Sequence, residues 1–258
     1  MNPVGAQALE APDLERRFGA LRRLYGAPHY ARIRAASVAV VGVGGVGSWA
    51  AEALARSGVA RLVLVDLDHV AESNINRQVQ ADSTTIGRAK VEAMAERVHA
   101  IHPGCELVAI DAFADADNWP ALLPDGVDGV IEACDDVRAK AAIAAWARGW
   151  PGAFVGVGAA GGKQRPQEVE LADLSAVTHD PLLASLRQRL RRDHGAPRQG
   201  PMGLRCVYSR EPVRSPDDAD CAVDGSLNCH GYGSSVAVTA TFGFTAAADL
   251  LMQLAPGI

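Results

Sequence analysis

The sequence predicts an α/β fold built on a doubly wound, mostly parallel sheet flanked by helices, with an irregular C-terminal extension. Short β-branched runs alternate with segments rich in Ala and Leu up to about residue 160. A glycine-rich turn directly follows the first of these runs. Aromatic residues make up only 5% of the 258 residues, as in tightly packed α/β layers. We expect a single domain over 14–258, with a core at 36–160 and an extension at 161–258.

The elements follow from local patterns in chain order. The continuous β-branched run at 38–43 is typical of a strand that is buried on both faces of a parallel sheet. Helices are expected to end before Gly58 and Pro103. Residues 194–220 are rich in Pro, Gly and Asp and are expected to form a long loop. Strands are expected at 38–43, 61–66, 106–112, 129–133 and 153–158, and helices at 14–35, 48–57, 87–102, 137–148, 184–192 and 239–254.

Charge and cysteine content narrow the class of protein. The net charge is −5, so a nucleic-acid partner would need a local basic patch. The five cysteines form no C-x-x-C pair and no cleavable signal is visible, which indicates a reduced, cytoplasmic protein. Residues 234–254 are long enough to span a bilayer and carry only Asp249 as a charge. Their Ser, Thr and Ala content favours a buried or interfacial helix over an integral span, and leaves peripheral membrane association open.

The glycine-rich turn predicts a bound nucleotide. Gly42, Gly44 and Gly47 form a G-x-G-x-x-G motif between a strand and a helix, with Gly45 inside it. The glycines permit close approach of a phosphate, and the helix N-terminus supplies N–H donors. Asp66 ends the next strand, where it would accept hydrogen bonds from ribose hydroxyls. This Rossmann-like pattern alone suits a nicotinamide or flavin enzyme equally well.

Polar residues beyond Asp66 favour ATP. Asp68, Asn74, Arg77 and Lys90 follow within about two dozen residues. Asn74, Arg77 and Lys90 would converge on a triphosphate, with the cations near the α-phosphate. There they would stabilise the charge that develops when a carboxylate attacks. Lys90 alone could instead be a solvated surface charge.

Two carboxylates follow the strand expected at 129–133. Asp135 and Asp136 would lie at the carboxyl edge of the sheet, where ligands bind in such folds. A carboxylate there could hold Mg²⁺ against nucleotide phosphates, and either residue could instead cap the next helix. We expect the magnesium role at Asp135.

These motifs together resemble the ubiquitin-activating-enzyme-like adenylyltransferases, over about residues 14 to 160. The motifs are Gly42-x-Gly44-Gly45-x-Gly47-Ser48, Asp66-x-Asp68, Ser73-Asn74-x-x-Arg77-Gln78, Gly87-x-x-Lys90 and Cys134-Asp135. Within that superfamily the chain looks most like the tRNA threonylcarbamoyladenosine dehydratases. That closer likeness extends to nearly the whole chain through Arg17-Phe18-Gly19, Ser48-Trp49-Ala50, Gly158-Ala159-Ala160-Gly161-Gly162, Asp180-Pro181-Leu182, Cys206-Val207-Tyr208-Ser209 and Thr239-Ala240-Thr241-Phe242-Gly243-Phe244.

The resemblance implies ATP-driven dehydration of threonylcarbamoyladenosine in tRNA through an acyl-adenylate. It implies catalytic roles for Arg77, Lys90 and Asp135, with Asp135 on Mg²⁺. It also implies a homodimer, often with an N-terminal arginine lent by the partner subunit. The expected position falls near Gly19 or Ala20, so Arg22 or Arg23 would have to substitute. A monovalent cation (Na⁺ or K⁺) and a sulfur-relay partner are left open. The expected ATP contacts are Gly42, Gly44, Gly45, Gly47, Asp66, Asp68, Ser73, Asn74, Arg77 and Lys90.

Three different functions also stay open. One is adenylation of the C-terminal glycine of a ubiquitin-like sulfur carrier, although the zinc-binding C-x-x-C pairs common in such enzymes are missing here. Cys206, Cys221 and Cys229 are too loosely spaced for us to expect zinc, while a reactive thiol at Cys229 or Cys134 is left open. The second function is that of an NAD-dependent oxidoreductase, and the third is that of an inactive partner protein that binds ATP.

An arginine-rich stretch in the second half of the chain favours an RNA substrate. It could grip tRNA phosphates, with Lys163 and Arg165 nearby in sequence. The alternative, without any binding function, is that these arginines form a solvated helix face. The stretch comprises Arg187, Arg189, Arg191, Arg192, Arg198, Arg205, Arg210 and Arg214. Arg187, Arg191 and Arg192 are our candidates for tRNA contacts.

Overall fold

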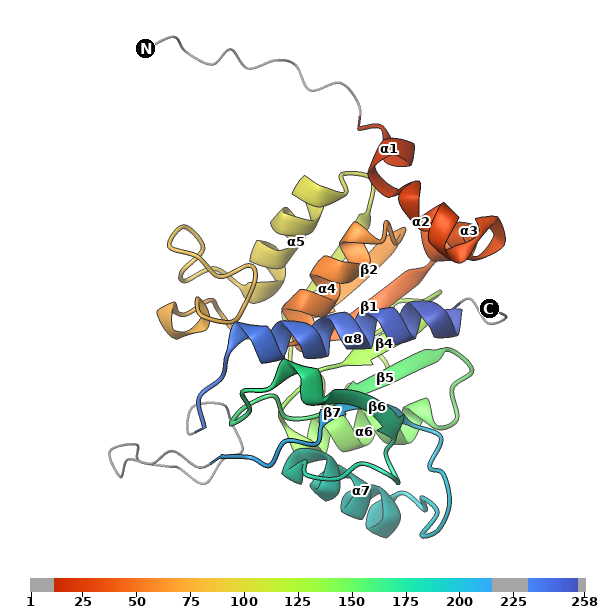
Figure 1. Ribbon diagram of the computed structural model, residues 1–258, viewed down its shortest axis with the longest axis vertical. Coiled ribbons are helices and arrows are strands. Elements are labelled where there is room, and N and C mark those ends of the chain that lie inside the picture. The colour runs from red at the N-terminus through yellow and green to blue at the C-terminus, as the bar shows by residue number, and fades with distance from the viewer. Residues whose placement is uncertain (1–11, 215–231, 255–258) are drawn as a thin grey trace.

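The computed structural model describes residues 12–214 and 232–254. Its centre is a seven-stranded sheet with the order β3-β2-β1-β4-β5-β7-β6 (Figure 1). Every pairing is parallel except that of β6 with β7. The doubly wound, mostly parallel sheet is therefore confirmed. The strands are β1 Ser37–Val41, β2 Arg61–Val65, β3 Glu106–Ile110, β4 Gly129–Glu132, β5 Ala153–Val157, β6 Val169–Asp173 and β7 Arg205–Ser209.

Helices cover both faces of the sheet. On one face lie α4 (Gly47–Arg56), α5 (Lys90–Ile101) and α8 (Val236–Leu254), and α8 runs across the strands in front of the sheet in Figure 1. The other face is covered by α6 (Val137–Ala147) and α7 (Pro181–Asp193). Because β1 is parallel to both β2 and β4, the carboxyl ends of these strands meet at one edge.

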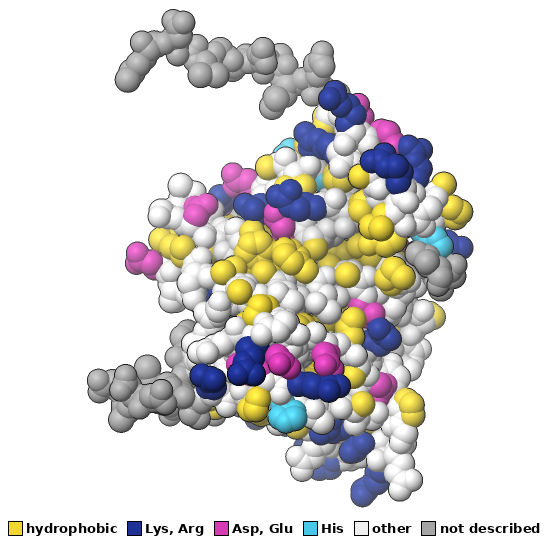
Figure 2. Space-filling model, viewed as in Figure 1, with side chains coloured by type: hydrophobic (Ala, Val, Ile, Leu, Met, Phe, Trp, Pro, Cys, Tyr) yellow, Lys and Arg dark blue, Asp and Glu magenta, His cyan; other side chains and the backbone are white. Residues whose placement is uncertain are grey.

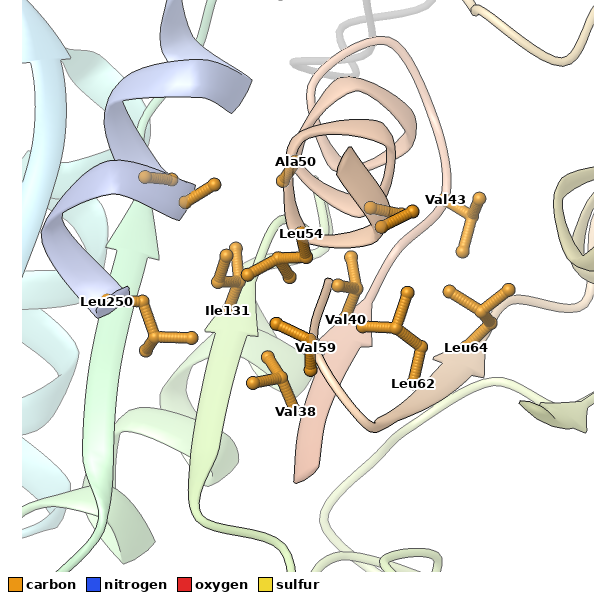
Figure 3. Packing of buried hydrophobic residues seen from close by; sticks show 14 of the residues in the cluster. Val38, Val40, Val43, Ala50, Leu54, Val59, Leu62, Leu64, Ile131 and Leu250 are labelled. Carbon is orange, nitrogen blue, oxygen red and sulfur yellow. The ribbon is translucent and has the colours of Figure 1, made fainter. Parts of the chain in front are cut away.

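The core explains the β-branched runs. Val38 and Val40 lie in the same apolar cluster as Leu54 of α4, and Leu250 of α8 joins that cluster beside Ile131 of β4 (Figure 3). The alternate residues of β1 belong to the core on the opposite face. All five residues of β1 are buried, so this strand needs apolar side chains in both directions.

Helix α8 packs tightly against α4. A Cβ on Gly243 would lie 2.8 Å from the backbone nitrogen of Ala50, so only glycine permits this approach. Asp249 of α8 receives a hydrogen bond from Arg205 Nε at 2.7 Å. By length and composition α8 could cross a membrane, but half of its most apolar stretch is buried inside the protein. The expected buried helix in this region is therefore observed, beginning at Val236.

The N-terminal helical region is divided. The single helix expected at 14–35 is instead α1 (Leu14–Phe18), α2 (Ala20–Tyr25) and α3 (Ala27–Ala35). The break between α2 and α3 has a clear cause, because Gly26 has a φ of 79°. Pro28 then occupies the first turn of α3.

The extension contains two strands that the sequence pattern did not predict. β6 and β7 add an antiparallel edge to the sheet, and β7 lies inside the expected loop at 194–220. Each is a five-residue segment without a strong period, so pairing with a neighbour decides its conformation. Helix α7 begins three residues earlier than expected because Asp180 caps it through Leu183 N. The 3₁₀ helices η1 (Glu72–Asn74) and η2 (Pro166–Glu168) were also not expected.

Candidate functional site

The glycines of the turn after β1 serve different purposes. Gly42 has a φ of 89°, and a Cβ there would lie 2.8 Å from the carbonyl oxygen of Ala133. A Cβ on Gly47 would overlap the carbonyl oxygen of Gly42. A Cβ on Gly44 would meet nothing within 4 Å. Gly42 and Gly47 thus close the turn, whereas Gly44 leaves space beside it for a ligand.

Arg77 lies across this turn. Its Cγ and Cδ are 3.4 and 3.5 Å from the position of a Cβ on Gly45. The guanidinium donates to the carbonyl of Ser73 at 2.6 Å and to Asn76 Oδ1 at 3.1 Å. Trp49 Nε1 of α4 donates to the carbonyl of Arg77 at 2.9 Å. The side chain is therefore held close to the glycine turn, and its contact with phosphates stays a prediction.

Asp66 joins the turn to the end of β2. Its Oδ2 accepts a hydrogen bond from the N–H of Val43 at 2.6 Å, and its Oδ1 accepts one from the N–H of Asp68 at 2.9 Å. Burial raises the pKa of Asp66, although Lys90 and the two N–H donors oppose that rise. Each oxygen still has lone-pair capacity for a ribose hydroxyl.

Lys90 is buried at the start of α5. Its side chain is 7% exposed, and Nζ donates to Asp68 Oδ2 at 2.7 Å. The backbone N–H of Lys90 also donates to the carbonyl of Asp68. The solvated-charge interpretation of Lys90 is therefore wrong. The ammonium is held at the edge of the sheet where β2 ends.

Asn74 has a local structural partner. It is buried, and its Oδ1 accepts a hydrogen bond from the N–H of Ala71 at 3.0 Å. This bond supports η1, whose neighbour Ser73 accepts from Arg77. Asn74 thus also positions Arg77, beyond the direct phosphate contact expected from the sequence.

The two carboxylates after β4 have different surroundings in the structure. Asp136 caps α6 by accepting hydrogen bonds from the N–H groups of Arg138 and Ala139, both at 2.8 Å. Asp135 is exposed, and its carboxylate has no hydrogen-bond partner among the described residues. No set of three His, Cys, Asp or Glu side chains converges on a metal position within 12–214 and 232–254. The magnesium role expected for Asp135 stays a prediction, in which phosphates and water would supply most of the ligands.

A fully buried ion pair beneath Asp135 was not predicted. Lys140 Nζ donates to Glu132 Oε2 at 2.5 Å and to the carbonyl of Val157 at 2.8 Å. Glu132 Oε1 accepts from the N–H of Cys134 at 2.9 Å. The pair ties the ends of β4 and β5 to the loop that carries Asp135. The sequence offered one signal for this ion pair, which is that Lys140 lies in an otherwise Ala-rich segment of α6.

The tRNA candidates on α7 have partners within the protein. Arg187 donates to the carbonyls of Leu174 and Val177, and Arg191 donates to that of Pro197. Arg192 forms an ion pair with its neighbour Asp193. These contacts give Arg187 and Arg191 structural roles, so their contact with tRNA stays a prediction.

The N-terminal arginines lie far from the turn within one chain. Arg17 donates to the carbonyl of Ile101 and Arg34 to that of Gly58, at the edge of the sheet where strands begin. Arg22 pairs with Glu15, and Arg23 is exposed. A role for Arg22 or Arg23 in the site of a partner subunit stays a prediction.

The cysteines do not form a reactive centre within the described residues. Burial raises the pKa of the Cys134 thiol well above its usual value, which disfavours a thiolate nucleophile. Burial likewise raises the pKa of Cys206. Cys221 and Cys229 lie outside the described residues.

Comparisons of the sequence and of the structure with known proteins all find the same family. The model of the ThiF family matches residues 18–255. A tRNA threonylcarbamoyladenosine dehydratase from Haemophilus influenzae is 41% identical over 247 residues, which is 94% of each chain. The crystal structure of the Escherichia coli tRNA N6-threonylcarbamoyladenosine dehydratase in complex with AMP superposes with a TM-score of 0.86. It is 39% identical and covers 96% of this chain and 97% of its own. The same enzyme in complex with ATP superposes with a TM-score of 0.84 and 39% identity, covering 95% of this chain and 97% of its own.

Proposed function

Since this chain belongs to the ThiF family and, within it, to the tRNA threonylcarbamoyladenosine dehydratases, we propose that it dehydrates N6-threonylcarbamoyladenosine in tRNA, driven by ATP. The observation that carries this proposal is the gathering of Asp66, Arg77 and Lys90 around the glycine turn at one edge of the sheet. A ribose acceptor and two cations there suit ATP that is attacked at its α-phosphate.

The reaction proceeds in two balanced steps. The threonine carboxylate oxygen attacks the α-phosphorus of ATP, and the bond to the β-phosphate breaks, which releases pyrophosphate. The carbamoyl group of the same side chain then attacks the acyl carbon and gives up one N–H proton to solvent, and AMP leaves with the former carboxylate oxygen as a five-membered ring closes. Together these steps remove one water from the modified base. Because the second nucleophile is part of the substrate, proximity replaces a protein thiol.

The protein's own residues supply binding and charge. Arg77 and Lys90 offset the negative charge that grows on the α-phosphate during attack. Asp66 orients the ribose, and Gly44 leaves room for the phosphates. When bound, Mg²⁺ would neutralise the phosphate oxygens and be held by Asp135 and water. A monovalent cation (Na⁺ or K⁺) remains a further expectation.

The assembly is proposed as well. We expect residues 14–258 to act as one domain, the chain to form a homodimer, and Arg22 or Arg23 to enter the partner's site. A homodimer would appear as twice the chain mass of 27.0 kDa in light scattering after size exclusion. A cytoplasmic location suits the reduced cysteines. A sulfur-relay partner would be sought by affinity capture.

The competing functions are less well supported. The relatives that align along nearly the full length are tRNA-modifying dehydratases, which favours that activity over activation of a sulfur carrier. An NAD-dependent oxidoreductase would have no need for Lys90 and Arg77 beside the phosphates. An inactive ATP-binding partner would release no pyrophosphate when given modified tRNA.

The decisive experiment combines MgATP with tRNA that carries threonylcarbamoyladenosine. Nucleoside mass spectrometry should show the loss of one water, with pyrophosphate released in equal amount. Arg77→Ala and Lys90→Ala should each lower that release by about a hundredfold or more. Arg88→Ala is the matched control, because Arg88 is an exposed cation that pairs with Glu96. Unchanged release in Arg77→Ala and Lys90→Ala would contradict the assignment of the site.

A further inference from the structure

A buried lysine outside the nucleotide site organises the ends of β5 and β7. Lys163 is 2% exposed, and its Nζ donates to the carbonyls of His179, Ser209 and Glu211 at 3.2, 3.2 and 2.8 Å. These carbonyls belong to the segment before α7 and to the segment that follows β7. The ammonium therefore fastens three stretches of chain together, at a depth where an unpaired charge would be costly.

Glu211 completes this junction. It is 4% exposed, and its Oε2 accepts hydrogen bonds from the N–H groups of Gln164 and Arg165 at 2.9 and 2.8 Å. The N–H of Arg214 donates to the carbonyl of Gly162 at 2.9 Å. Residues 162–165 and 211–214 are thus held side by side. We call these two segments, with Lys163 and Glu211 between them, the 162/214 platform.

The platform presents two arginine side chains to solvent. Arg165 and Arg214 are both exposed, and neither forms a salt bridge with any residue of 12–214 or 232–254. Both guanidinium groups are close enough to Glu211 to lower its pKa, and the N–H groups of Gln164 and Arg165 lower it too. These effects together outweigh the rise that burial causes. Figure 2 shows Lys and Arg side chains interspersed with Asp and Glu side chains below the start of α8.

The platform lies on the same edge of the sheet as the nucleotide site. β5 and β7 are parallel to β1, so their carboxyl ends face the same way as the glycine turn. β7 is separated from β1 by β4 and β5, which places the platform about 14 Å along the edge at about 4.8 Å per strand. If the carboxylate of the modified adenosine reaches the α-phosphate of ATP at the glycine turn, the RNA backbone that flanks it would lie within a few nucleotides of this position.

We propose that Arg165 and Arg214 bind phosphates of the tRNA backbone that flanks the modified adenosine, on the rigid 162/214 platform. This inference rests on the proposed function. It assigns the tRNA contact to two exposed arginines that form no salt bridge among residues 12–214 and 232–254, whereas Arg187 and Arg191 are engaged with carbonyl groups. Because the backbone of the platform is already ordered, binding a polyanion would have to order only the two arginine side chains.

The test uses Arg165→Gln, Arg214→Gln and the double variant of the full chain. The probe is a fluorescent anticodon stem-loop that carries threonylcarbamoyladenosine, titrated at several salt concentrations. The double variant should bind about tenfold more weakly, and the slope of log affinity against log salt should fall by about 1.5. Affinity for MgATP and the melting temperature should match wild type. The control is Arg16→Gln with Arg32→Gln, two exposed arginines at the opposite edge.

Each outcome decides the proposal. RNA affinity and salt slope equal to wild type in the double variant would overturn it, as would an equal weakening in the control. A parallel loss of MgATP affinity would also overturn it, because the platform would then serve the nucleotide. Water loss from modified tRNA is measured on the wild type separately. Its absence would refute the proposed function, whereas its presence with unchanged RNA binding would refute only the platform.

Discussion

At the scale of single residues, the site is built from side chains with two partners each. Asp66 bonds the glycine turn while it keeps capacity for ribose, and Lys90 pairs with Asp68 beside the phosphate region. The order of these residues along the chain was enough to predict that they lie together at the carboxyl edge of the sheet. That order could not show that Asn74 supports η1, since this bond depends on how the segment after β2 is folded.

Asp66→Asn should weaken ATP binding and alter the dependence of stability on pH. Loss of charged hydrogen bonds should cost about 1.5–3 kcal/mol, or at least about tenfold in Kd. Burial raises the folded pKa of Asp66 above the unfolded value of about 3.9, so its favourable contribution is present below that value and is lost as pH rises. The Asn variant should therefore gain in melting temperature relative to wild type as pH rises above about 4. A constant difference would contradict this account.

Asp135→Asn and Asp136→Ala should separate metal binding from helix capping. The Asp135 variant should need more Mg²⁺ for ATP to bind, while AMP, which lacks the β- and γ-phosphates, should bind as in wild type. The Asp136 variant should lose about 1 kcal/mol of unfolding free energy because it removes the α6 cap. Calorimetric Mg²⁺ titrations and urea unfolding would measure the two effects. The same response from both variants would refute the division of roles.

At the scale of elements, helices dock through specific close contacts as well as through apolar burial. The ring of His102, just after α5, packs against Phe18 of α1 with centroids 4.8 Å apart and planes tilted by 58°, and its Nε2 lies 3.1 Å from Arg34 Nη1. Gly243 brings α8 against α4. Local patterns predicted the helices themselves, but α1, α2 and α3 were expected as one because Gly26 alone does not reveal its φ.

His102 should make the stability of the contact between α5 and the N-terminal helices α1 and α3 depend on acid pH. Burial lowers the pKa of His102, and Arg34 and Arg17 lower it further. The unfolded chain therefore takes up the proton first, near pH 6.5, and stability is lost as pH falls from there toward the folded pKa. His102→Gln should reduce the loss of melting temperature between pH 7.5 and 5.5. His99→Gln, at an exposed position of α5, should leave that loss unchanged.

Gly243→Ala should destabilise the α4–α8 contact by about 1–3 kcal/mol, because a methyl group would press on the backbone of α4. Urea unfolding would measure the change. Ala248→Ser, on the exposed face of the same helix, serves as the control. A Gly243→Ala variant as stable as wild type would show that the two helices can move apart at no cost.

At the scale of the whole molecule, α8 belongs to the layered fold. It packs on the sheet together with α4, and Arg205 and Gln253 engage Asp249. Its outward side still carries apolar side chains at Val236, Phe244 and Met252. Figure 2 shows a band of apolar side chains along this helix. Because the opposite side of α8 is part of the core, leaving the sheet for a bilayer would expose that core to water.

The chain should therefore not insert into membranes. In a flotation assay with vesicles that contain anionic lipid, most of the protein should stay in the lower fractions at physiological salt. Phe244→Ser should not change that distribution. Binding of the wild type that salt does not reverse and Phe244→Ser abolishes would show that the face of α8 enters lipid.

The parallel sheet, the glycine turn and the order of the polar residues around it could all be predicted from the amino-acid sequence. Those features are local, since β-branched runs, glycine spacing and polar residues at strand ends act over a few neighbouring positions. Tertiary packing decided which of the polar side chains are exposed and which have partners within the protein. The fold uses Asp136 as a cap and leaves Asp135 exposed, it buries Lys140 and Lys163, and it engages Arg187 with carbonyl groups. Such outcomes depend on partners that are distant in the chain, and only packing brings those partners together.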